Sequence, residues 1–182
     1  SWYIYSDIEL ININQNFKII SNDSSDNPTT ANEGLVWFPP LNQLGSDIDG
    51  EASEDLSGYS VSLNSDGTIV AIGAAYNDGN GSDSGHVRIY QWNGTSWNQL
   101  GSDIDGEASS DWSGFSVSLN SGGTIVAIGA PMNDGNGQQS GHVRVYEWKD
   151  ANGGSDPSWN QLGSDIDGEA SNDNSGYSVS LN

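Results

Sequence analysis

The chain has 182 residues, no cysteine and a formal net charge of -21, from 25 acidic and four basic residues. This charge excludes electrostatic attraction to nucleic acid or to an anionic membrane as the main activity, because both carry the same sign. The lack of cysteine removes disulfides, zinc-thiolate sites and thiol chemistry. The acidity favours cations as counter-species, although solubility in a salty medium explains it as well.

The first 40 residues do not repeat, and we interpret them as a divergent N-terminal β segment. Alternating apolar and polar residues in SWYIYSDIELININ predict a strand, and SNDSSDNPTTANEG predicts a loop. GLVWFPPLNQLG aligns loosely with RIYQWNGTSWNQLG, so residues 35–44 are expected to end a degenerate first repeat. The start, without Met or a basic region, suggests a processed protein or a fragment. No apolar run is long enough for a membrane helix, so no membrane insertion is expected.

The remainder of the chain is a tandem repeat, in which the octapeptide SDIDGEAS occurs unchanged at 46–53, 102–109 and 164–171. Leu44 and Leu100 are 56 residues apart, and Leu100 and Leu162 are 62 apart. The extra residues lie in KDANGGSDPS, as expected of an insertion in an exposed turn. The boundaries are 41–112 for repeat 1, 113–174 for repeat 2, and 175–182 for the first strand of a further repeat.

Each repeat contains four β segments, which repeat 1 illustrates. Tyr59–Leu63 alternates apolar residues with serine and predicts a strand with one buried face, and NSDG at 64–67 predicts a tight turn. The apolar run Thr68–Ala74 predicts a central strand covered on both faces, followed by a polar loop. His86–Trp92 alternates again, and Ser96–Gly101 predicts the fourth strand after an Asn-Gly turn.

Four short strands in about 56 residues, with Trp and Gly at fixed places, are typical of β-propeller blades. We therefore predict an all-β fold of four-stranded antiparallel blades. A β-sandwich does not repeat in sequence, solenoid coils are shorter, and an independent domain of this size would bury too little apolar surface. Two full repeats do not close a ring of about four to eight blades. We expect a partial propeller or a fragment of a larger one, with completion by several chains as the alternative.

Three linked motifs resemble FG-GAP repeats, the blades of integrin-α-like propellers in their bacterial and marine form. They are SGYSVSLN (57–64, 175–182) with SGFSVSLN (113–120), IVAIGAA (69–75) with IVAIGAP (125–131), and SGHVRIY (84–90) with SGHVRVY (140–146). The resemblance implies a secreted or cell-surface propeller used in adhesion or ligand recognition, generally not an enzyme. The family's calcium loop between the first two strands is replaced by NSDG (64–67) and NSGG (120–123), so the usual metal site is predicted to be missing.

Two other groups of residues are candidate calcium ligands, because calcium takes six to eight oxygen ligands. The octapeptide supplies one group, whose members project from one face of an extended chain about 7 Å apart. This spacing is too wide for all three to bind one ion unless Gly106 bends the chain, and a solvated row of acids is the alternative. The other group lies in the polar loops, where Asx turns are the alternative explanation. The candidates are Asp47, Asp49, Glu51, Asp103, Asp105, Glu107, Asp165, Asp167 and Glu169 in the octapeptides, and Asn77, Asp78, Asn80, Asn133, Asp134 and Asn136 in the loops.

His86 and His142 recur at the same place in two repeats, so they are not expected to share a site, and a strand-capping or packing role is favoured over catalysis or metal binding. Arg88 and Arg144 are expected to pair with a repeated acid. Recurring tryptophans are expected to pack repeat against repeat. Trp112 does not recur, since Leu56 and Asn174 occupy its place, and it is the candidate ligand contact. Two hypotheses follow: a propeller that binds a protein or glycan ligand, with calcium as an assisting ion, or a structural protein whose copies build a filament, sheath or viral fibre.

Overall fold

The computed structural model describes residues 9–13, 16–20, 43–150 and 157–182. The chain divides into two units, one up to Gln43 and one from Leu44 to Asn182. In the first unit, β1 (Glu9–Ile13) and β2 (Asn16–Ile20) form an antiparallel hairpin, so part of the predicted N-terminal strand is confirmed. The predicted loop at 21–34, most of the segment 35–44 and the centre of the 149–158 insertion lie outside the described residues.

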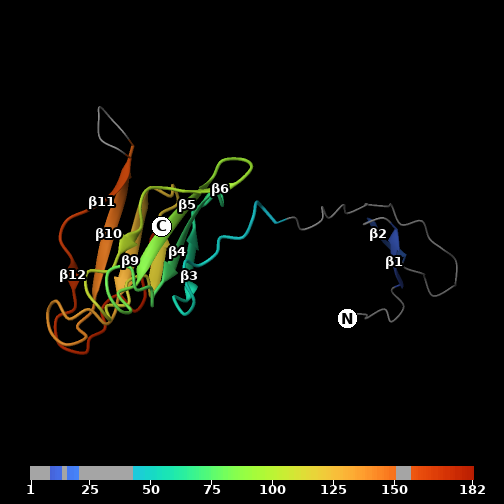
Figure 1. The fold of residues 1–182 in the computed structure, drawn as a ribbon. Coiled ribbons are helices and arrows are strands. Elements are labelled where there is room, and N and C mark those ends of the chain that lie inside the picture. Colours follow the sequence, from blue (N-terminus) through green and yellow to red (C-terminus); the bar gives the residue numbers. More distant parts are fainter. Residues whose placement is uncertain (1–8, 14–15, 21–42, 151–156) are drawn as a thin grey trace, which may run out of the picture. The chain divides into compact units, whose positions relative to one another are not determined.

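The second unit contains two antiparallel sheets, one from each repeat (Figure 1). The first sheet consists of β3 (Ser57–Leu63), β4 (Ile69–Ala74), β5 (His86–Trp92), β6 (Trp97–Gln99) and β7 (Ile104–Asp105). The second consists of β8 (Ser116–Leu119), β9 (Ile125–Ala130), β10 (His142–Lys149), β11 (Ser158–Gln161) and β12 (Ile166–Asp167). The described residues contain no helix. The predicted all-β class and antiparallel order are confirmed. The sheets are open and do not close into a ring, so the propeller stays a prediction.

The outer strand of each sheet is split into two pieces. β6 and β7 both pair with β5, and Leu100 between them donates its N–H to Ile89 O at 2.7 Å. The sequence predicted a fourth strand that ends at Gly101, before most of the octapeptide. That end was wrong, because the strand resumes after a short interruption and includes Ile104 and Asp105 of the octapeptide. The octapeptide is thereby fixed to its own sheet.

The turn between the first two strands is held by an asparagine. Asn64 Oδ1 accepts the N–H groups of Thr68 and Ile69, each at 2.9 Å. Asn120 makes the same two bonds in the second sheet. These bonds stabilise the turn without a charged side chain, so NSDG and NSGG form equivalent turns.

The apolar core lies where the two sheets pack together. Ile69, Val87 and Ile89 of the first sheet share one buried cluster with residues of the second. The second sheet's contributors to this cluster include Val117, Leu119, Val126, Ile128 and Tyr146. Ile104 of β7 joins the same cluster and is 6% exposed. The central strands β4 and β9 are therefore covered on both faces, as the sequence predicted.

The first strands of the two sheets, β3 and β8, differ in exposure although both contain SVSL. Val117 and Leu119 of β8 are 8% and 4% exposed, whereas Val61 and Leu63 of β3 are 53% and 54% exposed. The predicted buried face is confirmed for β8, which packs against the first sheet. It is not found for β3, because no described residue covers the same face there. The difference shows that a sheet completes the burial of the repeat that follows it.

Backbones approach closely where the sheets meet. A Cβ on Gly73 would overlap Gly114 O, and one on Gly129 would overlap Gly176 O. Ser60 Oγ also donates to Gly114 O at 2.7 Å, and Ser116 Oγ donates to Gly176 O at 2.8 Å. The same contact is thus made twice, with Gly176 in the place of Gly114.

We expect Gly73→Ala to reduce the free energy of unfolding by about 1–3 kcal/mol, because the added methyl group would push β4 away from the next repeat. Urea denaturation followed by circular dichroism measures the change. Gly122→Ala is the control, since a Cβ there would meet nothing closer than 3.8 Å. Equal losses in the two variants would contradict the close approach.

Candidate functional site

The second octapeptide contacts both sheets, and the first makes the matching contacts with the first sheet. In the second copy, Asp105 lies in β7 of the first sheet, and its carbonyl oxygen accepts Arg144 Nη2 of the second sheet at 2.7 Å. Two residues further on, Glu107 Oε1 lies 3.7 Å from Arg144 Nη1. The first copy makes the same contacts, since Asp49 O accepts Arg88 Nη2 at 2.7 Å. The second octapeptide therefore joins the two sheets, and the predicted arginine ion pairs are confirmed.

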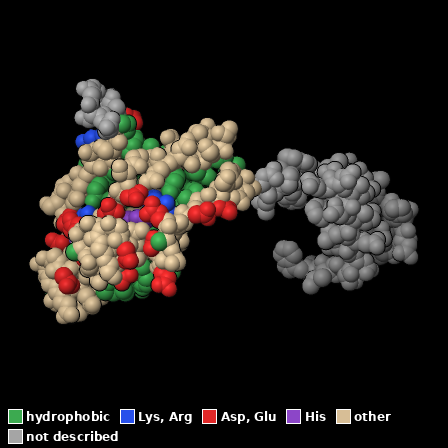
Figure 2. All heavy atoms as spheres, in the orientation of Figure 1, with side chains coloured by type: hydrophobic (Ala, Val, Ile, Leu, Met, Phe, Trp, Pro, Cys, Tyr) green, Lys and Arg blue, Asp and Glu red, His purple; other side chains and the backbone are tan. Residues whose placement is uncertain are grey.

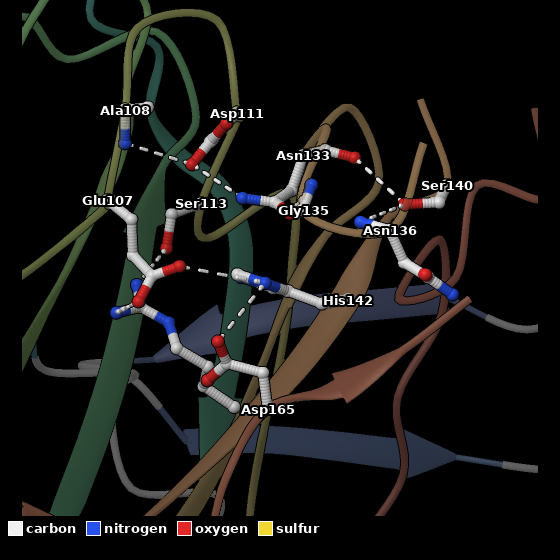
Figure 3. A network of polar contacts seen from close by, with 12 residues as sticks. Glu107, Ala108, Asp111, Ser113, Asn133, Gly135, Asn136, Ser140, His142 and Asp165 are labelled. Carbon is white, nitrogen blue, oxygen red and sulfur yellow. Dashed lines mark hydrogen bonds and ion pairs between the residues drawn. The ribbon is translucent and has the colours of Figure 1, made fainter. Parts of the chain in front are cut away.

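Two His–carboxylate clusters lie at these junctions. The first contains Glu51, His86 and Asp103, and the second contains Glu107, His142 and Asp165. His86 Nδ1 lies 3.8 Å from Glu51 Oε2 and 3.9 Å from Asp103 Oδ2. His142 Nδ1 lies 3.9 Å and 4.0 Å from the corresponding atoms. Each cluster thus combines a histidine with acids from two successive octapeptides, as Figure 3 shows for the second cluster.

In each cluster, the carboxylate oxygens that do not face the histidine contact a neighbouring glutamine or arginine. Gln161 Nε2 donates to Asp165 Oδ1 at 2.7 Å, and Gln99 makes the same bond to Asp103. The arginine guanidinium faces the other oxygen of the glutamate, and it also lies over a tyrosine ring, at 5.6 Å for Arg144 and Tyr146. The oxygens that face the histidine are therefore oriented by neighbouring residues.

Both histidines are buried, with exposures of 2% for His86 and 1% for His142. Burial lowers the pKa of His86 below its usual value of 6.5, an effect that outweighs the opposing influence of Asp103 and Glu51. Burial also lowers the pKa of His142, with Arg144 acting in the same direction. Both imidazoles are thus neutral at pH 7. His142 Nε2 is buried and has no hydrogen-bond partner in the described part of the chain.

The acids predicted as calcium ligands separate between clusters. Asp103 faces His86 of its own sheet, whereas Glu107 of the same octapeptide faces His142 of the next. Glu51 and Asp165 occupy the other positions of the two clusters. Asp49 and Asp105 provide carbonyl oxygens for the arginines. Figure 2 shows the acidic side chains gathered around the histidine and arginine side chains on one face of this unit.

The predicted loop ligands use their polar atoms within the loops. Asn77 Oδ1 accepts Gly79 N–H, and its amide donates to the buried Asp55 at 2.8 Å. Asp78 Oδ1 accepts the N–H of Asp83, and Asn80 donates to Gly106 O. The second sheet repeats these contacts through Asn133, Asp134 and Asn136. The contacts match the Asx-turn alternative, and calcium binding at these residues stays a prediction.

Trp112 lines an open pocket of about 600 Å³ between the two repeats. The indole ring packs against Tyr76 and Phe115, at centroid distances of 5.1 and 6.2 Å. The other lining residues include Asp83, Glu107, Asp111, Met132, Asn133, Gln138 and Gln139. Trp112, Leu56 and Asn174 all have positive φ, so the backbone there is the same whichever side chain is present. The pocket therefore has an aromatic wall that the equivalent positions lack.

No protein-family model matches the chain. No curated protein matches it either. In the described part of the chain, no helix is both long enough and apolar enough to span a membrane.

We expect the protein to lose stability as the pH falls from 7.5 to 5.5. A histidine in the unfolded chain binds a proton near pH 6.5, while the folded protein holds both histidines neutral to lower pH. The unfolded state then binds more protons, so the free energy of unfolding is greatest above pH 6.5 and falls below it. Each histidine contributes at most about 1.4 kcal/mol per pH unit. Urea denaturation in metal-free buffer across this range measures the slope.

The double variant His86→Gln/His142→Gln is the control for this dependence. The groups facing His86 are Glu51, Asp103, Arg88 and Asp105, and the variant leaves them in place. We expect a shallower slope between pH 7.5 and 5.5. The same slope in both proteins would show that other groups cause the pH dependence.

Proposed function

We propose that the two sheets are consecutive blades of a β-propeller and that the protein is a non-enzymatic recognition module on a cell surface or in the extracellular medium. The packing of sheet on sheet supports the blade arrangement, because apolar residues of the two repeats, among them Ile89 and Ile128, share one buried cluster. The resemblance to FG-GAP repeats supports the location and the role. The His–carboxylate clusters occur once per repeat, which suits residues that maintain a junction more than a single catalytic centre.

The pocket beside Trp112 carries the recognition proposal. Its volume of about 600 Å³ falls within the usual range for small-ligand sites, about 300–1,000 Å³. An indole face provides an apolar surface for a sugar ring, and the surrounding carboxylates and amides provide hydrogen-bonding groups for hydroxyls. A neutral or basic glycan fits this site best, because Asp83 and Glu107 would repel an anionic one.

We expect Trp112→Leu to weaken glycan binding at least about tenfold, or about 1.4 kcal/mol. Leucine occupies the equivalent position in the first repeat, so the backbone accepts it. An array of neutral and amino-sugar glycans identifies the ligand, and calorimetry compares the two proteins. Leu56→Asn is the control, because it changes the equivalent exposed position outside the pocket. Unchanged affinity in Trp112→Leu would exclude the indole from the site.

A second candidate function, self-association into a filament, is supported by one further observation. Segments 43–64 and 161–182 have the same sequence except at Glu54/Asn172 and Leu56/Asn174. The first segment packs on the first sheet through Ile48 and through β3. The second segment contacts the second sheet, where Leu181 N–H donates to Ser118 Oγ, but no described strand pairs with its residues 177–182.

The second segment of one molecule can therefore replace the first segment of another, with nearly the same contacts. Such an exchange is head-to-tail, so it does not close on itself and builds an open polymer. Val179 and Leu181 would then occupy the places of Val61 and Leu63 in the receiving sheet and would pack against the second sheet of their own molecule, as Val117 and Leu119 pack against the first sheet.

Two matched substitutions test the exchange, since Val61 and Val179 lie at the same place in SGYSVSLN, which occurs at 57–64 and 175–182. We expect Val179→Asp to reduce polymers by weakening the incoming segment, and Val61→Asp to increase them by weakening the resident one. Analytical ultracentrifugation over a range of concentrations measures the distribution. A monomeric wild-type protein at all concentrations, or equal effects of the two substitutions, would contradict the exchange.

A further inference from the structure

We propose that each His–carboxylate cluster binds one divalent transition-metal ion of the Zn²⁺ class. In both clusters, an imidazole nitrogen and two carboxylate oxygens lie within 4.8 Å of one another. Ligand atoms about 2.0–2.1 Å from a tetrahedral zinc ion are about 3.4 Å apart. Small movements of the two carboxylates would therefore bring all three atoms to coordinating distance.

The donor set selects the class of ion. A nitrogen ligand beside two carboxylates is typical of Zn²⁺ and related ions, whereas calcium takes six or more oxygen ligands. Each cluster offers three donors from the protein, which leaves a fourth position for water. The side chains of Glu107 and Asp165 are 44% and 30% exposed, so solvent and an ion reach the cluster from the outside.

The imidazole is buried and directed at the two acids without bonding to either. At 3.9 and 4.0 Å, the separations from His142 Nδ1 to Glu107 and Asp165 are too long for hydrogen bonds. The ring is 1% exposed, and Nε2 has no partner among the described residues. In the tautomer that carries its proton on Nε2, the Nδ1 lone pair faces the two carboxylate oxygens, and a cation between the three atoms would be coordinated by all of them. Nδ1 of His86 lies at similar distances from Glu51 and Asp103 in the first sheet.

Neighbouring residues already orient the donors, as the outer partners of metal ligands usually do. Gln161 holds Asp165 by one oxygen and leaves the other towards the histidine. Arg144 faces Glu107 Oε1, which leaves Oε2 towards the same nitrogen. The arginine reduces the negative charge of the cluster.

Metal binding would strengthen the junction between repeats. Glu107 lies between β7 and β8, and His142 and Asp165 belong to the second repeat. An ion held by all three ties the connection to the following sheet. Because it binds only the folded protein, it also raises the unfolding temperature.

The experiment uses the full chain, stripped with EDTA and transferred to metal-free buffer at pH 7.5. Zn²⁺ is titrated by calorimetry, and Co²⁺ is used to record the absorption of the bound ion. We expect two ions per chain, one for each cluster. Asp165→Asn should reduce the count to one, and Asp103→Asn/Asp165→Asn should abolish it. Ca²⁺ should bind at least about a hundredfold more weakly.

Asp167→Asn is the matched control, because it removes the same charge from the same octapeptide outside the cluster. It should keep both ions. If Asp165→Asn does not fold by circular dichroism, Glu107→Gln takes its place. Absence of saturable Zn²⁺ binding below about 1 mM would overturn the proposal, as would equal losses in Asp165→Asn and Asp167→Asn or equal affinity for Ca²⁺.

Discussion

Burial of one sheet's apolar face by the next is the constraint on which the second unit depends. A repeat of about 56 residues cannot cover its own central strand, so Ile69 and Ile89 need Val126 and Ile128 of the neighbouring sheet. The difference in exposure between the valine and leucine side chains of β3 and those of β8 shows this dependence. Two strands of nearly the same sequence have different exposure because only β8 has a sheet on that side.

The same constraint explains why the octapeptide is repeated without change. Asp103 faces the histidine of its own sheet, Ile104 enters the shared core, and Asp105 presents its carbonyl to the next sheet. Gly106 passes so close to Ser84 O that a Cβ would overlap it, and Glu107 reaches the next arginine. Ala108 N–H then donates to Asp111, and Ser109 packs against Gly81. All seven positions from 103 to 109 therefore make contacts, five through a side chain or the lack of one and two, Asp105 and Ala108, through the backbone.

The strands were predictable because each carries a local pattern. The run IVAIGA is apolar on both faces, SVSL alternates, and Asn-Gly or Asn-Ser-Asp-Gly marks the turns; these features depend only on neighbours in the chain. The resumption of the outer strand at Ile104 was not predictable, because Leu100–Asp103 has the composition of a turn. Only pairing with Val87 shows that the strand continues.

The His–carboxylate clusters were missed for a related reason. The sequence shows that His86 and His142 recur at a fixed distance from the octapeptides, and it correctly indicated that the two histidines do not share a site. It does not show that one octapeptide serves two sheets. Three acids at alternate positions suggested a single group of ligands, yet the junction turns Asp103 and Glu107 towards different histidines. The recurrence of the two histidines was the available signal. Each histidine has an octapeptide acid before it and another after it in the sequence, which indicates a contact between repeats. The geometry of that contact depends on how the sheets stack.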